Sequence, residues 1–155
     1  MGPHDVIDGK FGYFKLIETA GSLEDAFERW GAPWKVTELA HKPFPAGRAT
    51  QAALTAIIDI KREAQFGIGD LASLTAHVPS LIGLLVGRPF DPAMSPEYAR
   101  LCLQFVAPQM IEHGLIDPRR FVPEVFASQA ARAQAGLVQV VLDDNPDPNA
   151  MAPQT

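Results

Sequence analysis

A proline-stiffened loop that opens directly into a long apolar helix pattern is the feature that most constrains the fold of this chain. The loop is Lys42–Pro45, and the helix pattern follows over Gly47–Phe66. Leu54 and Ile57 share one face of such a helix, whereas Asp59 lies mostly outward. We therefore expect a helix that buries one side against the rest of its domain.

Shorter patterns along the chain alternate between helix and strand. Strands are expected over Trp34–Leu39, Leu71–Val78 and Leu137–Leu142, where apolar and polar residues alternate or β-branched residues gather. Helices are expected over Lys10–Thr19, Ser22–Trp30, Ser95–His113 and Phe121–Ala135, and Pro79–Val86 fits a short helix or an irregular apolar segment. These patterns predict an α+β fold of two layers, with the helices packed on one face of a small β-sheet.

Capping and breaking residues predict where several helices begin and end. Ser95 fits the N-cap of its helix, with Pro96 at the first helical position. Pro108 is expected to kink or split that helix, because proline has no backbone N–H to donate. Gly114 is expected to close it, and Gly67 to end the long helix that follows the loop.

Length and charge limit what the chain can be. A chain of 155 residues is expected to form one domain, residues 1–155, which buries roughly 68–70% of its unfolded surface. There are 13 basic and 18 acidic residues, and no run of cations is longer than a pair. Nucleic acid is therefore not an expected partner, because its recognition needs a basic surface.

Cysteine content and hydropathy narrow the class further. Cys102 is the single cysteine, which excludes an intramolecular disulfide and an iron–sulfur cluster held by several thiolates. Its apolar surroundings favour a buried, inert thiol over a nucleophile. The first residues do not resemble a signal peptide, and apolar runs such as Leu81–Val86 are too short to span a membrane. A cytoplasmic location without a membrane partner is expected.

The loop also places cations at the start of the long helix. Lys42 and Arg48 bracket the point where unpaired backbone N–H groups and the helix dipole create a partial positive charge. A carboxylate there would meet the dipole, an ammonium group and a planar guanidinium group together. This combination is suited to small polycarboxylates.

The same residues resemble the signature of the MmgE/PrpD family, in which a Lys-x-aromatic-Pro loop precedes a helix start bearing Arg, His or Gln. The matching residues are Lys42, Phe44, Pro45, Arg48 and Gln51. Further similarity lies in the stretch Asp8–Phe14, in the helix start Ser95–Ala99 and in the spacing from Gly114 to Phe121. Enzymes of this family act on citrate-like and aconitate-like acids.

The resemblance implies a domain and an activity. Family members are much longer and carry a large helical domain ahead of this region, so the chain is similar to their smaller C-terminal domain with the N-terminal helical domain absent. The implied activity is dehydration, decarboxylation or epimerisation of a di- or tricarboxylate, by proton abstraction next to a carboxylate. No cofactor and no metal are implied, and the expected partners are the helical domain, in cis or in trans, and a further copy in a homo-oligomer.

The resemblance also suggests roles for five residues. Lys42, Arg48 and Gln51 are candidate substrate-binding residues, and Tyr98 and His41 are candidate catalytic residues. Each has a structural alternative: the two cations fit solvated positions, the tyrosine fits a buried ring with a hydrogen-bonded hydroxyl, and the histidine fits an exposed loop imidazole.

One departure from the family concerns proton transfer. Many members carry a histidine at the positions of Gly47, Ala49 or Gln51, and this chain has none there. A glutamine can hold a carboxylate through its NH₂ group but cannot shuttle a proton at neutral pH. The chain alone is therefore expected to be inactive. The alternative is a non-catalytic association module, or one subunit of a split two-chain enzyme.

Overall fold

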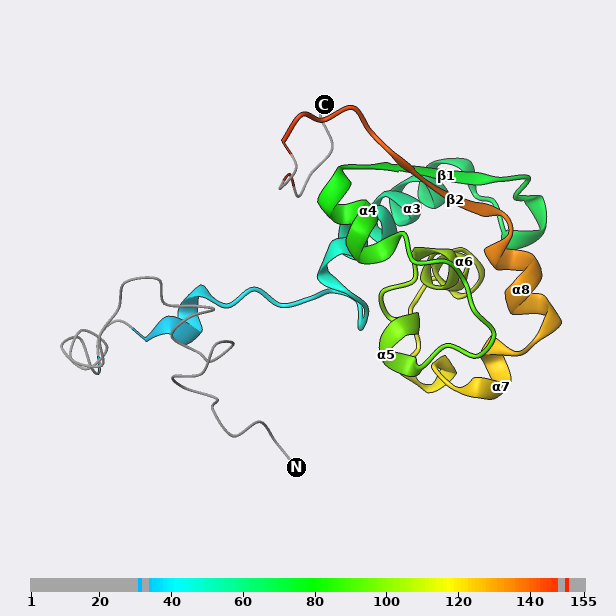
Figure 1. The fold of residues 1–155 in the computed structure, drawn as a ribbon, viewed down its shortest axis with the longest axis horizontal. Helices are drawn as coiled ribbons and strands as arrows, with labels where there is room; N and C mark the ends of the chain where they lie inside the picture. Colours follow the sequence, from blue (N-terminus) through cyan, green and yellow to red (C-terminus); the bar gives the residue numbers. More distant parts are fainter. Residues whose placement is uncertain (1–30, 32–33, 148–149, 151–155) are drawn as a thin grey trace. The chain divides into compact units, whose positions relative to one another are not determined.

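The structure is a computed structural model that describes Gly31, residues 34–147 and Ala150 (Figure 1). The chain divides into two compact units, Met1–His41 and Lys42–Thr155. The expected helices at Lys10–Thr19 and Ser22–Trp30 and the stretch Asp8–Phe14 lie outside the described residues.

The described part of the first unit contains a short 3-10 helix, η1 (Lys35–Glu38), so the strand expected over Trp34–Leu39 is wrong. The backbone N–H of Thr37 donates to the carbonyl of Trp34 at 3.1 Å, and that of Leu39 donates to Val36 at 3.3 Å. These groups are bonded within a turn instead of across a sheet, and the alternating sequence pattern carries no information about such pairing.

The second unit holds the remaining elements. They are η2 (Arg48–Thr50), α3 (Gln51–Ala64), η3 (Ile68–Asp70), β1 (Leu74–Val78), α4 (Ser80–Val86), α5 (Pro96–Ala99), α6 (Leu103–His113), η4 (Pro118–Arg120), α7 (Pro123–Phe126), α8 (Gln129–Ala135) and β2 (Val138–Leu142). The expected long helix, the second and third expected strands and the short helix after Pro79 are thus present.

β1 and β2 form a two-stranded parallel sheet, in which Leu74 pairs with Val138 and Val78 with Leu142. Parallel neighbours need a long crossover, and the helices α4 to α8 supply it. Val78 and Val138 are buried on the helix side, whereas Thr75 on the other side is exposed. Figure 1 shows α6, α7 and α8 on one side of the sheet, and the expected α+β fold is confirmed.

α6 is the centre of this unit, and every residue from Phe105 to Ile111 is buried. It packs against α3, α8 and β2 (Figure 1). The ring of Phe105 meets Phe121 and Phe126 edge to face, with centroids 5.6 and 5.2 Å apart. Such aromatic contacts stabilise a core beyond the area they bury.

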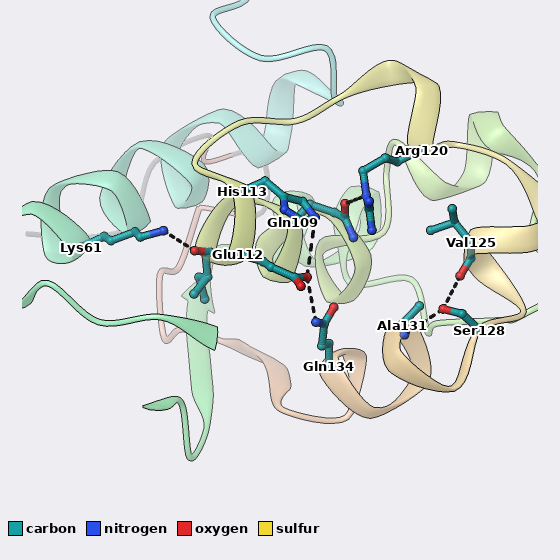
Figure 2. A network of polar contacts seen from close by, with 10 residues as sticks. Lys61, Gln109, Glu112, His113, Arg120, Val125, Ser128, Ala131 and Gln134 are labelled. Atoms are coloured by element: carbon teal, nitrogen blue, oxygen red, sulfur yellow. Dashed lines mark hydrogen bonds and ion pairs between the residues drawn. The ribbon is translucent and has the colours of Figure 1, made fainter. Parts of the chain in front are cut away.

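Polar side chains tie the neighbouring helices to α6 (Figure 2). Lys61 of α3 donates to the carbonyl oxygen of Ile111. Gln134 of α8 donates to the carboxylate of Glu112 at 2.8 Å. These bonds hold the helices on both sides of α6 in register with it.

The expected helix Ser95–His113 is broken, and at a different place from the one expected. Ser95 caps α5, its Oγ accepting from the N–H of Tyr98, but α5 ends at Ala99. The backbone of Cys102 is extended and forms an isolated antiparallel β-bridge with Gly87, so it cannot continue the helix. Pro108 instead lies inside the continuous helix α6, where the surrounding core compensates for the lost hydrogen bond.

Two further helix boundaries differ in detail. The segment Phe121–Ala135 forms two helices, because Ser128 caps α8 by accepting from the N–H of Ala131. α3 ends before Gly67, at Ala64, followed by Gln65 in a left-handed conformation. Gly114, with φ 70°, closes α6 as expected.

Candidate functional site

The proline loop is held against the start of α3 by the side chain of Gln51. Its Oε1 accepts from the N–H of Phe44 at 3.1 Å, and its Nε2 donates to the Phe44 carbonyl at 3.2 Å. The same Nε2 lies within hydrogen-bonding distance of the carbonyls of Ala46 and Gly47, at 3.4 and 3.1 Å. Gln51 was predicted to bind a substrate carboxylate, and in this structure its amide is occupied by the loop backbone.

The far end of the loop is fixed to the turn after α5. The N–H of Gly47 donates to the carbonyl oxygen of Arg100 at 2.8 Å. A Cβ at Gly47 would lie 2.5 Å from Cδ2 of Leu101 and 3.3 Å from the Arg100 oxygen. Glycine therefore permits a close approach of two segments that are distant in the sequence.

Beside these contacts lies an open surface hollow of about 500 Å³, here called the loop hollow. It is lined by Lys42, Pro43, Phe44, Pro45, Ala46, Arg100 and Pro118. Its two charged residues are both cations and both are exposed. The loop hollow therefore has the charge and the size to accept a small anion.

Arg100 was not predicted from the sequence, although it stands two residues after the candidate Tyr98. Its guanidinium carbon lies 5.7 Å from the centroid of the Phe121 ring, within the range of a cation–π contact. Arg100 lies in the turn where the expected helix is interrupted between α5 and α6. Because this interruption depends on tertiary contacts, no local sequence pattern could have indicated that Arg100 lines the loop hollow.

Pro118 closes another side of the loop hollow and belongs to η4. The following Arg120 turns inward, and its Nε donates to Oε1 of the buried Gln109 at 2.5 Å (Figure 2). Asp117 and Arg119 form a surface pair, with Arg119 Nη2 2.8 Å from Asp117 Oδ2. Hydrogen bonds from Arg119 lower the pKa of the Asp117 carboxyl.

The other predicted site residues lie elsewhere. Arg48 is exposed in η2 and does not line the loop hollow. His41 is exposed and belongs to the first unit. The hydroxyl of Tyr98 donates to the carbonyl of Pro89 at 2.8 Å, and burial raises the pKa of this hydroxyl. The structure thus brings Lys42 together with Arg100, and not with Arg48.

Cys102 is fully buried, as predicted, and its thiol donates to the carbonyl of Arg88 at 3.3 Å. Burial raises the pKa of this thiol to about 11. A thiol that stays protonated at neutral pH is a poor nucleophile, which supports the prediction that the Cys102 thiol is unreactive.

A second hollow of about 280 Å³ lies between α3, β1 and α6, and it differs in chemistry. Its lining is mainly aliphatic and includes Ala53, Ile57, Val78 and Leu103. No lysine or arginine lines it, although His77 does, so a carboxylate placed there would lose its hydration without meeting a permanent cation. In the part of the chain that the structure describes, the loop hollow is the better candidate for an anionic ligand.

The described residues show neither a metal-binding cluster nor a membrane-spanning helix. No group of three or more His, Cys, Asp or Glu residues there is arranged to hold a metal ion. No helix in the same residues has both the length and the apolar character needed to cross a membrane.

Comparison with known proteins identifies the family of the chain. A search of the curated proteins finds no match. The family model described as the MmgE/PrpD C-terminal domain matches residues 44–155, which begins two residues after the start of the second compact unit. The match covers well over half of the chain, and the chain therefore belongs to the MmgE/PrpD family through its C-terminal domain.

Proposed function

We propose that this chain supplies the carboxylate-binding part of an MmgE/PrpD-type active site for a small di- or tricarboxylate. The observation that carries the proposal is the loop hollow, in which Lys42 of the signature loop lies with a second cation and no carboxylate among the lining residues. The shape and charge of this hollow suit a citrate-like or aconitate-like acid.

The chemistry proposed is dehydration, in which a proton next to a carboxylate and a hydroxide leave as water, or epimerisation, in which that proton is removed and returned to the other face. For decarboxylation, carbon dioxide leaves first and the resulting carbanion next to a carboxylate then takes up a proton. As the proton leaves, negative charge builds up on the neighbouring carboxylate, and a fixed ammonium group there lowers the barrier. The lining residues Lys42, Phe44 and Arg100 offer no side chain whose ordinary pKa lies near neutrality. The base is therefore proposed to come from the family's helical domain, in cis or in trans.

Arg48 keeps a proposed role outside the loop hollow. It is exposed at the start of η2, three residues after Pro45 of the loop, and its proposed role is to bind a carboxylate that extends beyond the hollow. Arg48→Lys keeps the charge but loses the planar two-bond contact, so it is expected to weaken a ligand only if that contact forms.

Binding of citrate and of cis-aconitate to the full chain, measured by calorimetry and by NMR titration, tests the proposal. Lys42→Gln is expected to weaken binding about tenfold or more, equivalent to about 1.4 kcal/mol. Arg62→Gln is the matched control, because it removes one positive charge from an exposed position on α3. Equal effects of the two variants would show that only the net charge of the protein matters.

Turnover provides a second test. The chain alone is expected to show none on these acids, whereas an assembly with the family's helical domain is expected to show activity. In that assembly, Lys42→Ala is expected to reduce transition-state stabilisation by roughly 2–4 kcal/mol. Activity that survives Lys42→Ala unchanged would contradict the proposed role.

A second candidate function is association without catalysis, as a module or as one subunit of a split enzyme. It is favoured by exposed apolar side chains on α4 and β2, where Leu84 is 77% and Leu142 57% exposed. Such side chains favour association with the helical domain, or self-association when that domain is missing. Sedimentation of wild type and Leu84→Lys measures self-association through this surface, and Leu115→Lys is the control for nonspecific hydrophobic association. A wild type that stays monomeric at high concentration would count against the association function.

A further inference from the structure

We infer that Arg100 makes the loop hollow selective for ligands that carry at least two carboxylates, with one bound by Lys42 and the other by Arg100. This inference rests on the proposed function of the loop hollow and adds to it a residue that determines specificity. Neither the signature loop nor any other local sequence pattern assigns a role to Arg100.

Two cations from different segments of the chain line the loop hollow. Lys42 comes from the proline loop and Arg100 from the turn after α5, and both line the same hollow. The ion pairs found among the described residues are Arg62–Asp59, His113–Glu112 and Arg119–Asp117, so neither of these two cations has a carboxylate partner there. Two like charges in one hollow repel each other, and a dianion that bridges them relieves this repulsion better than a monoanion does.

The carboxylates near Arg100 interact mainly with other groups. Glu97 lies one turn before Arg100 on α5, and its pKa is lowered first by a hydrogen bond with its own backbone and next by one with Ser95. Arg100 makes the smallest contribution to this lowering. Asp117, which precedes Pro118 of the lining, is paired with Arg119. Arg100 therefore keeps its charge available to a ligand.

Arg100 is held in place at two points. Its carbonyl oxygen accepts the hydrogen bond from Gly47, which ties the turn to the proline loop. Its guanidinium group lies over the ring of Phe121, which is itself buried against the core. A guanidinium group over an aromatic face keeps its edge N–H groups for a carboxylate, and ordering it beforehand reduces the entropy lost on binding.

A series of simple acids tests the inference on the full chain. The probes are tricarballylate, glutarate and butyrate, which carry three, two and one carboxylates, and binding is followed by calorimetry and by NMR titration. Wild type is expected to bind the first two at least tenfold more tightly than butyrate. Arg100→Gln is expected to remove this preference, because it weakens the binding of tricarballylate and glutarate at least tenfold more than the binding of butyrate.

Two further variants make the result specific. Arg132→Gln removes a charge from an exposed position on α8 and is expected to keep the wild-type preference. Arg100→Lys keeps the charge but not the planar guanidinium edge, so it is expected to reduce the preference for polycarboxylates over butyrate only partly. If Arg100→Gln does not fold, the binding measured for Arg100→Lys tests the role of Arg100. NMR spectra of each free variant check that the fold is kept.

The outcomes separate the two proposals. If wild type binds none of the three acids, the proposed function of the loop hollow fails and the inference fails with it. In another outcome, polycarboxylates bind in a way that depends on Lys42, but Arg100→Gln and Arg100→Lys keep the preference or weaken the binding of all three acids equally. That outcome overturns the inference alone.

Discussion

Gln51 forms a two-way hydrogen bond with the backbone of Phe44, accepting from its N–H at 3.1 Å and donating to its carbonyl at 3.2 Å. The first residue of α3 thus fixes a loop that lies seven residues earlier in the chain. A glutamine suits this task because its amide presents one donor and one acceptor side by side, as a backbone peptide does. The residue predicted to contact the substrate is, in this structure, the residue that shapes the loop hollow.

Gln51→Ala is expected to destabilise the protein by about 1–3 kcal/mol, because it leaves partly buried backbone groups of the loop without partners. Chemical denaturation measures this change, and Gln139→Ala on the exposed side of β2 is the control. Gln51→Glu is expected to destabilise as well, because a carboxylate cannot donate to the Phe44 carbonyl. If Gln51→Ala unfolds at the same denaturant concentration as Gln139→Ala, the hydrogen bonds to the loop contribute little.

Gly47→Ala is expected to destabilise the protein by about 1 kcal/mol, through its contact with Leu101 and the Arg100 carbonyl. The backbone itself is not the obstacle, since φ of Gly47 is −57° and any residue adopts this value. Gly69→Ala is the matched control, because a Cβ there meets no atom of the described residues within 4 Å. Equal unfolding midpoints for the two variants would mean that the loop moves away from Leu101 at no cost.

Two adjacent arginines should respond differently to the same substitution. Arg120→Met removes the partner of the buried Gln109 and is expected to cost about 1–3 kcal/mol. Arg119→Met removes a surface pair with Asp117, in which the arginine side chain is 90% exposed, and is expected to leave the unfolding midpoint unchanged. Thermal melts of the two variants compare them, and the reverse order would show that the surface pair holds η4 in place.

Cys102 is expected to make stability depend on alkaline pH. Its pKa is about 11 in the folded protein and close to the ordinary value of about 8.5 when unfolded. A raised folded-state pKa contributes stability that is fully present below pH ~8.5 and is lost as pH rises through about 11, a difference of about 3 kcal/mol.

The matched variant for this prediction is Cys102→Ala, which cannot titrate at this position. The free energy of unfolding is measured by denaturation of wild type and of this variant between pH 8 and pH 11. The difference between the two proteins gives the contribution of the thiol, because the other titrating groups contribute equally to both. In addition, the thiol of the folded protein is expected to react with alkylating reagents far more slowly at pH 8 than the unfolded chain does. Rapid alkylation without unfolding would show that the thiol is accessible.

The sequence by itself determined the features that depend on local periodicity and on single capping residues. The apolar face of α3, the strand patterns at β1 and β2, the Ser95 cap of α5 and the closing Gly114 were all predicted correctly. Burial of Cys102 and membership of the MmgE/PrpD family also followed from residues that can be recognised without a structure. For the helix, strand and cap assignments, the determining interactions lie within a few residues along the chain.

The tertiary structure alone decided how the loop hollow is built. Whether Ser95–His113 stays one helix depends on Cys102 pairing with Gly87, and the resulting break is what places Arg100 opposite Lys42. The amide of Gln51 is equally able to meet a ligand or a loop, and only the position of Phe44 settles which it meets in this structure. Such choices depend on contacts between segments distant in the sequence, whose free energies no local pattern records.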